Sequence, residues 1–99
     1  MRLSFEGTVK NVNTMAPIPY ATITTGSYST LPGSIDPAFY TPRVTTTADA
    51  QGRFTIDDKC MTYDYLEARA AGYQTLALAV ACAPVRRTMP MTLIPLTYP

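Results

Sequence analysis

The chain has 99 residues, of which 46% are hydrophobic and 15% are charged, and its formal net charge at pH 7 is +1. A chain of this length forms one domain, here 1–99, and buries roughly two-thirds of its unfolded surface. The near-zero charge argues against a nucleic-acid-binding protein, and no apolar run reaches the roughly 18 residues of a membrane-spanning helix, so we expect neither nucleic acid binding nor membrane insertion. Abundant threonine, nine prolines and seven tyrosines favour an all-β domain with many turns.

The first half of the chain contains two predicted strands followed by a long irregular segment. Leu3–Lys10 alternates apolar and polar residues, which is the period of a half-buried strand. Ile18–Thr24 is the second strand, and Pro19 must lie at its start or on an edge because proline donates no backbone hydrogen bond. Glycine, serine and proline are dense from 25 to 42, which predicts a long inserted loop of the kind that is usually functional or disordered.

The second half predicts five further strands, over 43–47, 53–56, 65–70, 74–82 and 88–96. The turn signal Asp49–Gly52 predicts a hairpin of strands 43–47 and 53–56. The turn signal Ala71–Tyr73 predicts a second hairpin, of strands 65–70 and 74–82. The sequence also predicts a turn over Asp57–Lys59. Good helix formers over 65–71 leave a short helix as the alternative there, although apolar and charged residues alternate in this stretch as in a strand.

Four segments carry a family resemblance: Phe5–Val9, Pro17–Ile23 with its paired prolines, Thr45–Ile56, and Leu66–Tyr73, which ends in Gly-Tyr. In this order they resemble the carboxypeptidase regulatory-like domain, a member of the transthyretin-like β-sandwich group. The resemblance implies a seven-strand antiparallel Greek-key β-sandwich with no catalytic residues and no cofactor. Asp64 stands where the family usually has tyrosine, and the preceding glycine is missing, so a bulge or altered register is expected over 60–64.

Cys60 and Cys82 are the two cysteines of the chain. If the last hairpin turns at 72–73, Cys82 faces position 63, and the bulge implied by the family departures would bring it to Cys60. A disulfide there would stabilise the fold by about 3 kcal/mol and indicate an oxidising compartment. The alternative is two buried free thiols that pack as small apolar groups. We therefore expect an extracellular, cell-surface or periplasmic location. Residues 1–6 lack the apolar core of a signal peptide, so we expect the export signal to be supplied elsewhere.

Candidate catalytic and metal-binding residues are few. The chain has no histidine, and Lys10 and Lys59 are its only lysines, so we expect no enzyme and no metal site. Asp49, Asp57 and Asp58 could together bind calcium, but hydrogen bonding within turns is the favoured interpretation. We expect the doublet Arg86-Arg87 to lie solvated in a loop.

The predicted interaction surface comprises Tyr28, Phe39, Tyr40 and Arg43. Loops on a rigid sandwich concentrate binding residues, and aromatic side chains anchor interfaces. In the alternative interpretation the rings fold back over one sheet and extend the core.

We therefore expect a non-catalytic docking module of a larger secreted, surface or secretion-spike protein that binds another protein or a glycan. The alternative is a self-assembling structural subunit of an extracellular fibre or sheath. The low number of charged residues favours this alternative, because few charges are available to prevent pairing at strand edges. A third hypothesis is a carrier or small enzyme with a ligand pocket, for which the sequence names no ligand.

Overall fold

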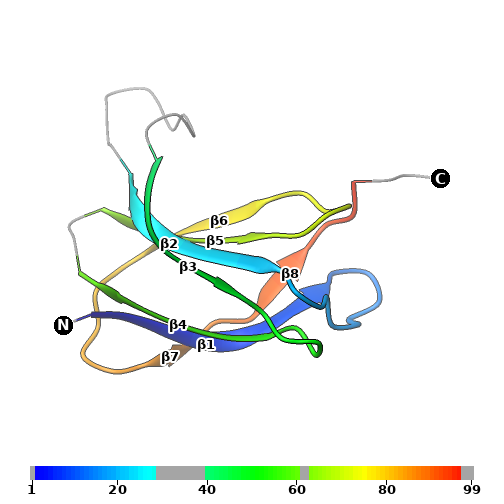
Figure 1. The fold of residues 1–99 in the computed structure, drawn as a ribbon, viewed down its shortest axis with the longest axis horizontal. Helices are drawn as coiled ribbons and strands as arrows, with labels where there is room; N and C mark the ends of the chain where they lie inside the picture. Colours follow the sequence, from blue (N-terminus) through cyan, green and yellow to red (C-terminus); the bar gives the residue numbers. More distant parts are fainter. Residues whose placement is uncertain (1, 29–39, 61–62, 97–99) are drawn as a thin grey trace.

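The computed structural model describes residues 2–28, 40–60 and 63–96, which form eight strands and no helix (Figure 1). The strands are β1 (Arg2–Asn11), β2 (Thr22–Tyr28), β3 (Tyr40–Thr47), β4 (Arg53–Lys59), β5 (Asp64–Arg69), β6 (Leu76–Val80), β7 (Arg87–Thr88) and β8 (Met91–Leu93). The all-β prediction is confirmed, and the short helix considered for 65–71 is wrong because that stretch forms most of β5. None of the described segments is a helix long and apolar enough to cross a membrane.

Two sheets pack as a β-sandwich. One has the order β3-β2-β5-β6 and is antiparallel throughout. The other is built around β1, which pairs antiparallel with β4 and parallel with both β7 and β8. The described residues therefore hold eight strands with two parallel pairings, not seven antiparallel strands. The predicted strand over 88–96 is divided at Pro90, which has no backbone N–H to continue the ladder.

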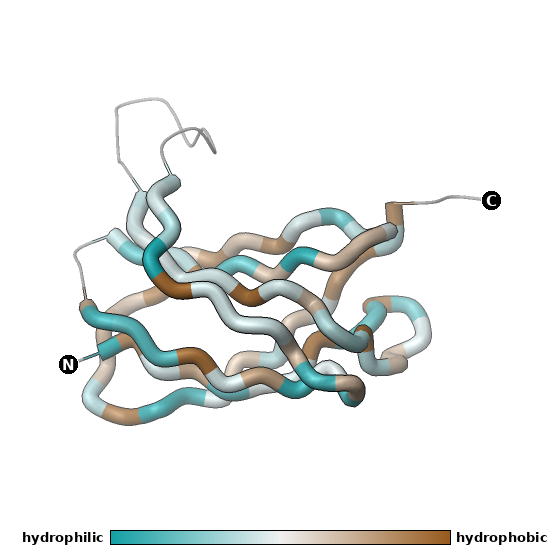
Figure 2. The backbone as a smooth tube through the Cα atoms, in the orientation of Figure 1, coloured by the Kyte–Doolittle hydropathy of each residue, from teal (hydrophilic) through white to brown (hydrophobic). Residues whose placement is uncertain are grey.

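Alternation along the strands builds the core between the sheets. Leu3, Phe5 and Val9 of β1 are fully buried, and Phe5 is paired with Ile56 of β4. Figure 2 shows hydrophobic positions interspersed among hydrophilic ones in both sheets. Burial of one such large side chain contributes roughly 1.5–3 kcal/mol. The other fully buried large apolar side chains are Ile23 and Leu66 of the facing sheet and Met91 and Leu93 of β8.

Several predicted boundaries are corrected by the structure. The second strand begins at Thr22 rather than Ile18, because Tyr20 takes a left-handed φ of 60° that a strand cannot accommodate. β2 then continues to Tyr28 and β3 starts at Tyr40, so residues 25–28 and 40–42 of the predicted loop belong to strands. The predicted turn over 57–59 is the end of β4, where these residues pair with β1.

Candidate functional site

Four tyrosines gather at the end of the sandwich where β2 ends and β3 and β5 begin. Tyr28 and Tyr40 are partners across the β2–β3 ladder, with ring centroids 6.0 Å apart. Tyr40 stacks on Tyr65, at 4.6 Å and an interplanar angle of 21°, and Tyr28 lies 5.9 Å from Tyr63. We call these four residues the tyrosine cluster. Each such ring pair contributes about 0.5–1.5 kcal/mol beyond its buried area.

The cluster is buried on one side and open on the other. Tyr65 is 3% exposed, Tyr28 and Tyr40 are half-buried, and Tyr63 is 47% exposed. Burial, together with the nearby Glu67 carboxylate, raises the pKa of Tyr65. The rings are therefore held from below while part of their surface faces solvent.

Gly26 makes room for this arrangement. It is paired with Tyr65 across the β2–β5 ladder. A Cβ at Gly26 would clash with the Thr41 carbonyl oxygen and would lie 2.8 Å from the Tyr65 hydroxyl. A glycine is therefore needed here for close approach, and not for its backbone freedom.

The structure places Arg43 in an ion-pair network between the sheets. Its Nε donates to Asp58 Oδ2 at 2.9 Å, and its Nη2 donates to Asp64 Oδ1 at 2.7 Å. The side chains are 13%, 4% and 1% exposed for Arg43, Asp58 and Asp64. Burial opposes the charge of Arg43, but the hydrogen bonds and charges of the two aspartates outweigh it, so the pKa of Arg43 is raised. We therefore assign Arg43 to the support of the predicted surface rather than to its contact face.

A disulfide links the sheets at the same end. Cys60 follows β4 of one sheet and Cys82 follows β6 of the other, and their Cα atoms are 5.7 Å apart. The sulfurs and the Asp64 carboxylate lie within 4.8 Å of one another. Both sulfurs are joined in the disulfide and Asp64 pairs with Arg43, so this trio is not a set of ligands for a metal ion.

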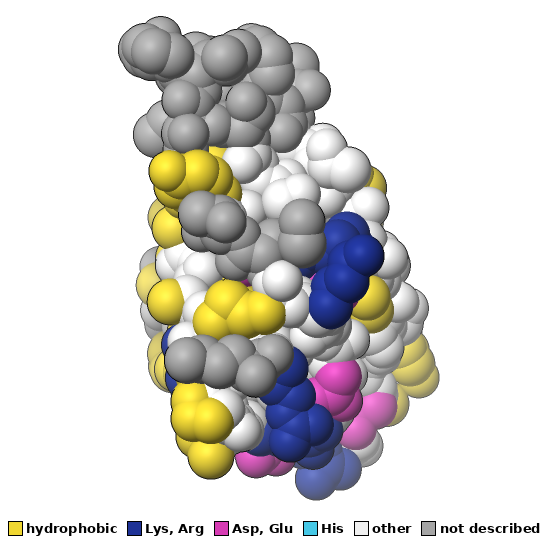
Figure 3. All heavy atoms as spheres, turned by 90° about the vertical axis from the view of Figure 1, so that its left-hand side faces the viewer, with side chains coloured by type: hydrophobic (Ala, Val, Ile, Leu, Met, Phe, Trp, Pro, Cys, Tyr) yellow, Lys and Arg dark blue, Asp and Glu magenta, His cyan; other side chains and the backbone are white. Residues whose placement is uncertain are grey.

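Figure 3 looks onto this end of the molecule, where hydrophobic side chains reach the surface beside lysine or arginine and acidic ones. Of the predicted surface residues, the structure brings Tyr28 and Tyr40 together and places Arg43 in the ion-pair network described above. Phe39 lies outside the described residues. Tyr63 and Tyr65 were missed as surface candidates, because only the β2–β5 pairing shows that they lie beside Tyr28 and Tyr40.

The three aspartates considered for calcium are separated into different interactions. Asp49 accepts hydrogen bonds from the backbone N–H groups of Arg53 and Gln51, each at 2.9 Å, and these bonds lower its pKa. Asp57 accepts from the Ser4 hydroxyl and from Arg86, while Asp58 pairs with Arg43. This arrangement fits hydrogen bonding within the fold and does not assemble a calcium site.

Arg86 and Arg87 make specific contacts rather than forming a solvated doublet. Arg86 Nε donates to Ser4 Oγ at 2.9 Å, and its Nη2 lies 3.0 Å from Asp57 Oδ2. The Arg87 guanidinium lies 4.7 Å from the centroid of the Phe5 ring and donates to the Ala81 carbonyl. Arg86 is therefore exposed but paired, and Arg87 is half-buried at the start of β7 rather than solvated in a loop.

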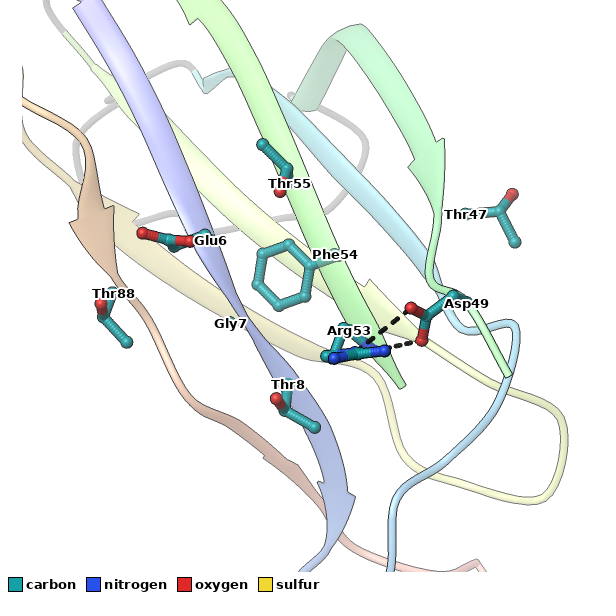
Figure 4. Close-up of a pocket in the computed structure, with 9 residues that line it drawn as sticks. All are labelled: Glu6, Gly7, Thr8, Thr47, Asp49, Arg53, Phe54, Thr55 and Thr88. Carbon is teal, nitrogen blue, oxygen red and sulfur yellow. Dashed lines mark hydrogen bonds and ion pairs between the residues drawn. The ribbon is translucent and has the colours of Figure 1, made fainter. Parts of the chain in front are cut away.

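A second candidate region is a polar depression of about 530 Å³ over β1 and β4 (Figure 4). Its walls are the hydroxyls of four threonines, the Glu6 carboxylate and the exposed Arg53–Asp49 ion pair, whose nitrogen and oxygen are 3.4 Å apart. The depression can form hydrogen bonds through its threonine hydroxyls and charged groups.

No family model matches the chain, and no curated protein matches it significantly. Among solved structures it is similar to 3-chlorocatechol 1,2-dioxygenase from Rhodococcus opacus 1CP, with a TM-score of 0.64 and 12% identity over 96% of this chain and 60% of that one. It is also similar to catechol 1,2-dioxygenase from Acinetobacter sp. ADP1 inhibited by bound mercury, with a TM-score of 0.63 and 11% identity over 97% of this chain and 53% of that one. The chain spans 60% or less of these enzymes, and at such identities the likeness concerns the fold alone.

Proposed function

We propose that this domain is a non-catalytic docking module that contacts another protein through the tyrosine cluster. The observation that carries the proposal is the gathering of four tyrosine rings, with Tyr63 47% exposed, at one end of the sandwich. Tyrosine supplies a large amphipathic contact area at a low cost in side-chain entropy, and it is enriched at the centres of interfaces.

The support beneath the rings favours binding without rearrangement. The disulfide Cys60–Cys82 and the Arg43 network both join the two sheets close to the cluster. Rigid placement lowers the ordering cost of association. The disulfide is also compatible with an extracellular or periplasmic location.

The chemistry of the described side chains supports a binding role. Ser4 is 1% exposed, and its hydroxyl is engaged by both Asp57 and Arg86. A hydroxyl buried between this acceptor and this donor is held in place and is out of reach of a substrate in solvent. The chain contains no histidine that could act as a general base.

We further propose that the fold is the transthyretin-like Greek-key sandwich and that the chain is a carboxypeptidase regulatory-like domain of a larger secreted or surface protein. Three of the four resembling segments lie on β1, on the β3–β4 hairpin, and on β5 with its following turn. β7 and β8 would count together as one interrupted strand, which restores a seven-strand count.

The test is a capture experiment on extracellular proteins of the source organism with matched tyrosine variants. Tyr63→Ser removes the most exposed ring of the cluster, and Tyr20→Ser removes a 65% exposed tyrosine outside it. A true partner is retained by the wild-type domain and by Tyr20→Ser, and binds Tyr63→Ser at least about 10-fold more weakly. Equal losses in both variants, or retention by both, would show that the cluster is not the contact surface. Binding to a glycan array in place of any protein would assign the surface to a different class of partner.

A further inference from the structure

The outer strand β6 has unusual chemistry for a sheet edge. It is the last strand of its sheet and pairs only with β5 among the described residues. No charged residue occurs between Arg69 and Arg86, and β6 contains no proline. Leu76, Leu78 and Val80 are half-buried on the core side, and the two alanines between them are exposed. An uncharged edge strand offers unpaired backbone groups to another strand.

The other described edges carry features that discourage pairing. β4 ends in Asp57, Asp58 and Lys59. β3 contains Pro42, and a register shift leaves Arg43 outside the ladder. β7 has two residues and β8 has three. Charges, proline, bulges and short length are the devices that protect edges, and within the described residues β6 has none of the first three.

We propose that β6 pairs antiparallel with β6 of a second copy of this chain, joining the two four-stranded sheets into one. When the pairing is centred on Leu78, Leu76 of one copy lies opposite Val80 of the other, and Ala77 lies opposite Ala79. Every opposed pair is then apolar and no like charges meet. The core-side residues of both copies face the same side, so the strand matches itself under two-fold symmetry.

The neighbouring structure limits how far this pairing extends. Just before β6, Gln74 donates its backbone N–H to the Ile94 carbonyl at 2.7 Å, and Leu96 donates to the Gly72 carbonyl at 2.9 Å. The edge is therefore already covered at 72–74, and the exposed part is β6 itself. Five residues span about 17 Å, and such a pairing buries less than the roughly 1,200 Å² of a stable interface. We expect a weak dimer with a Kd on the order of 0.1 mM.

The test is sedimentation velocity of the oxidised protein from about 10 µM to about 1 mM, a range that brackets the expected Kd. The wild-type mass should rise from the 10.8 kDa monomer toward the dimer. The double variant Ala77→Lys/Ala79→Lys opposes like charges across the proposed pair and should remain monomeric. An equimolar mixture with Ala77→Glu/Ala79→Glu should restore association through mixed pairs. Circular dichroism shows whether each variant is folded.

Two controls separate this edge from the rest of the surface. Thr55→Lys adds one positive charge at an exposed position of the β4 edge and should dimerise as the wild type does. Tyr63→Ser should also leave dimerisation unchanged, so failure of this proposal and failure of the tyrosine-cluster proposal give different results. A wild type that is monomeric throughout the series, a lysine double variant that associates as strongly as the wild type, or a Thr55→Lys variant that loses association would each overturn the pairing.

Discussion

Replacing Arg43 tests whether the buried ion pairs hold the two sheets together. Arg43→Ala leaves Asp58 and Asp64, whose side chains are 4% and 1% exposed, without this positive partner. Removing one member of a buried ion pair costs about 3–5 kcal/mol, because the remaining charge is left uncompensated. For a domain of this size each kcal/mol lowers Tm by about 4–8 °C, so the expected drop is at least about 12 °C.

The matched control is Arg53→Ala. Arg53 pairs with Asp49, but the two side chains are 68% and 47% exposed. Exposed pairs of this kind contribute about 0–1 kcal/mol, so Arg53→Ala should lower Tm by only a few degrees. Both variants are compared with the wild type by thermal and urea unfolding at pH 7.

A charge-free variant sharpens the comparison. Arg43→Met/Asp58→Asn/Asp64→Asn removes the network as a whole and should be more stable than Arg43→Ala alone, because no buried charge remains unpaired. The reasoning is refuted if Arg43→Ala lowers the free energy of unfolding no more than Arg53→Ala does. It is also refuted if the triple variant is less stable than Arg43→Ala by further large losses from Asp58→Asn and Asp64→Asn.

Three further predictions concern the same end of the sandwich and the acidic groups. Replacing both Cys60 and Cys82 by alanine should cost about 3 kcal/mol in urea unfolding, from closure of a loop with a sequence separation of 22, and an unchanged midpoint would contradict this. Gly26→Ala should destabilise the fold and change the near-ultraviolet tyrosine signal, since its Cβ meets the Thr41 carbonyl and the Tyr65 hydroxyl, and an unchanged stability and signal would contradict this. Hydrogen bonds from Ser4 and Arg86 lower the pKa of Asp57, and the backbone N–H of Arg53 lowers that of Asp49. The folded pKa values of both aspartates lie below the unfolded value of about 4. The stability that these carboxylates contribute is therefore present above that pH and is lost as the pH falls through the folded values. Tm should decline on acidification below about pH 4, and a rise in Tm would contradict the assignment.

The local sequence pattern was sufficient to predict strands with regular alternation and turns with characteristic turn residues. The alternation over 3–10 predicts β1, and the Asp49–Gly52 signal predicts the β3–β4 hairpin, in which Gly52 takes a φ of 75°. The charged run at 57–59 resembles a turn in sequence, but it pairs with β1 and extends β4. A strand edge exposed to solvent tolerates charges, so composition alone could not place this boundary.

The site depends on contacts between distant segments. The register shift at Thr25 and Gly26 leaves Arg43 unpaired in the β2–β3 ladder, while its side chain reaches the two aspartates. Bulges of this kind redirect a side chain and leave no local sequence signal. The tyrosine cluster likewise requires the β2–β5 register, which sets Tyr65 opposite Gly26. A glycine facing an aromatic residue across a ladder is the one signal that could have indicated this arrangement.

The most direct test of the central claim is a hydrogen-exchange footprint of the domain with a partner captured by the wild type and lost by Tyr63→Ser. Our account predicts that slowed exchange concentrates on the ends of β2, β3 and β5, at residues 26–28, 40–41 and 63–65. Protection centred instead on the β1–β4 face around the polar depression, with the tyrosine end unchanged, would contradict the assignment of the tyrosine cluster as the docking surface.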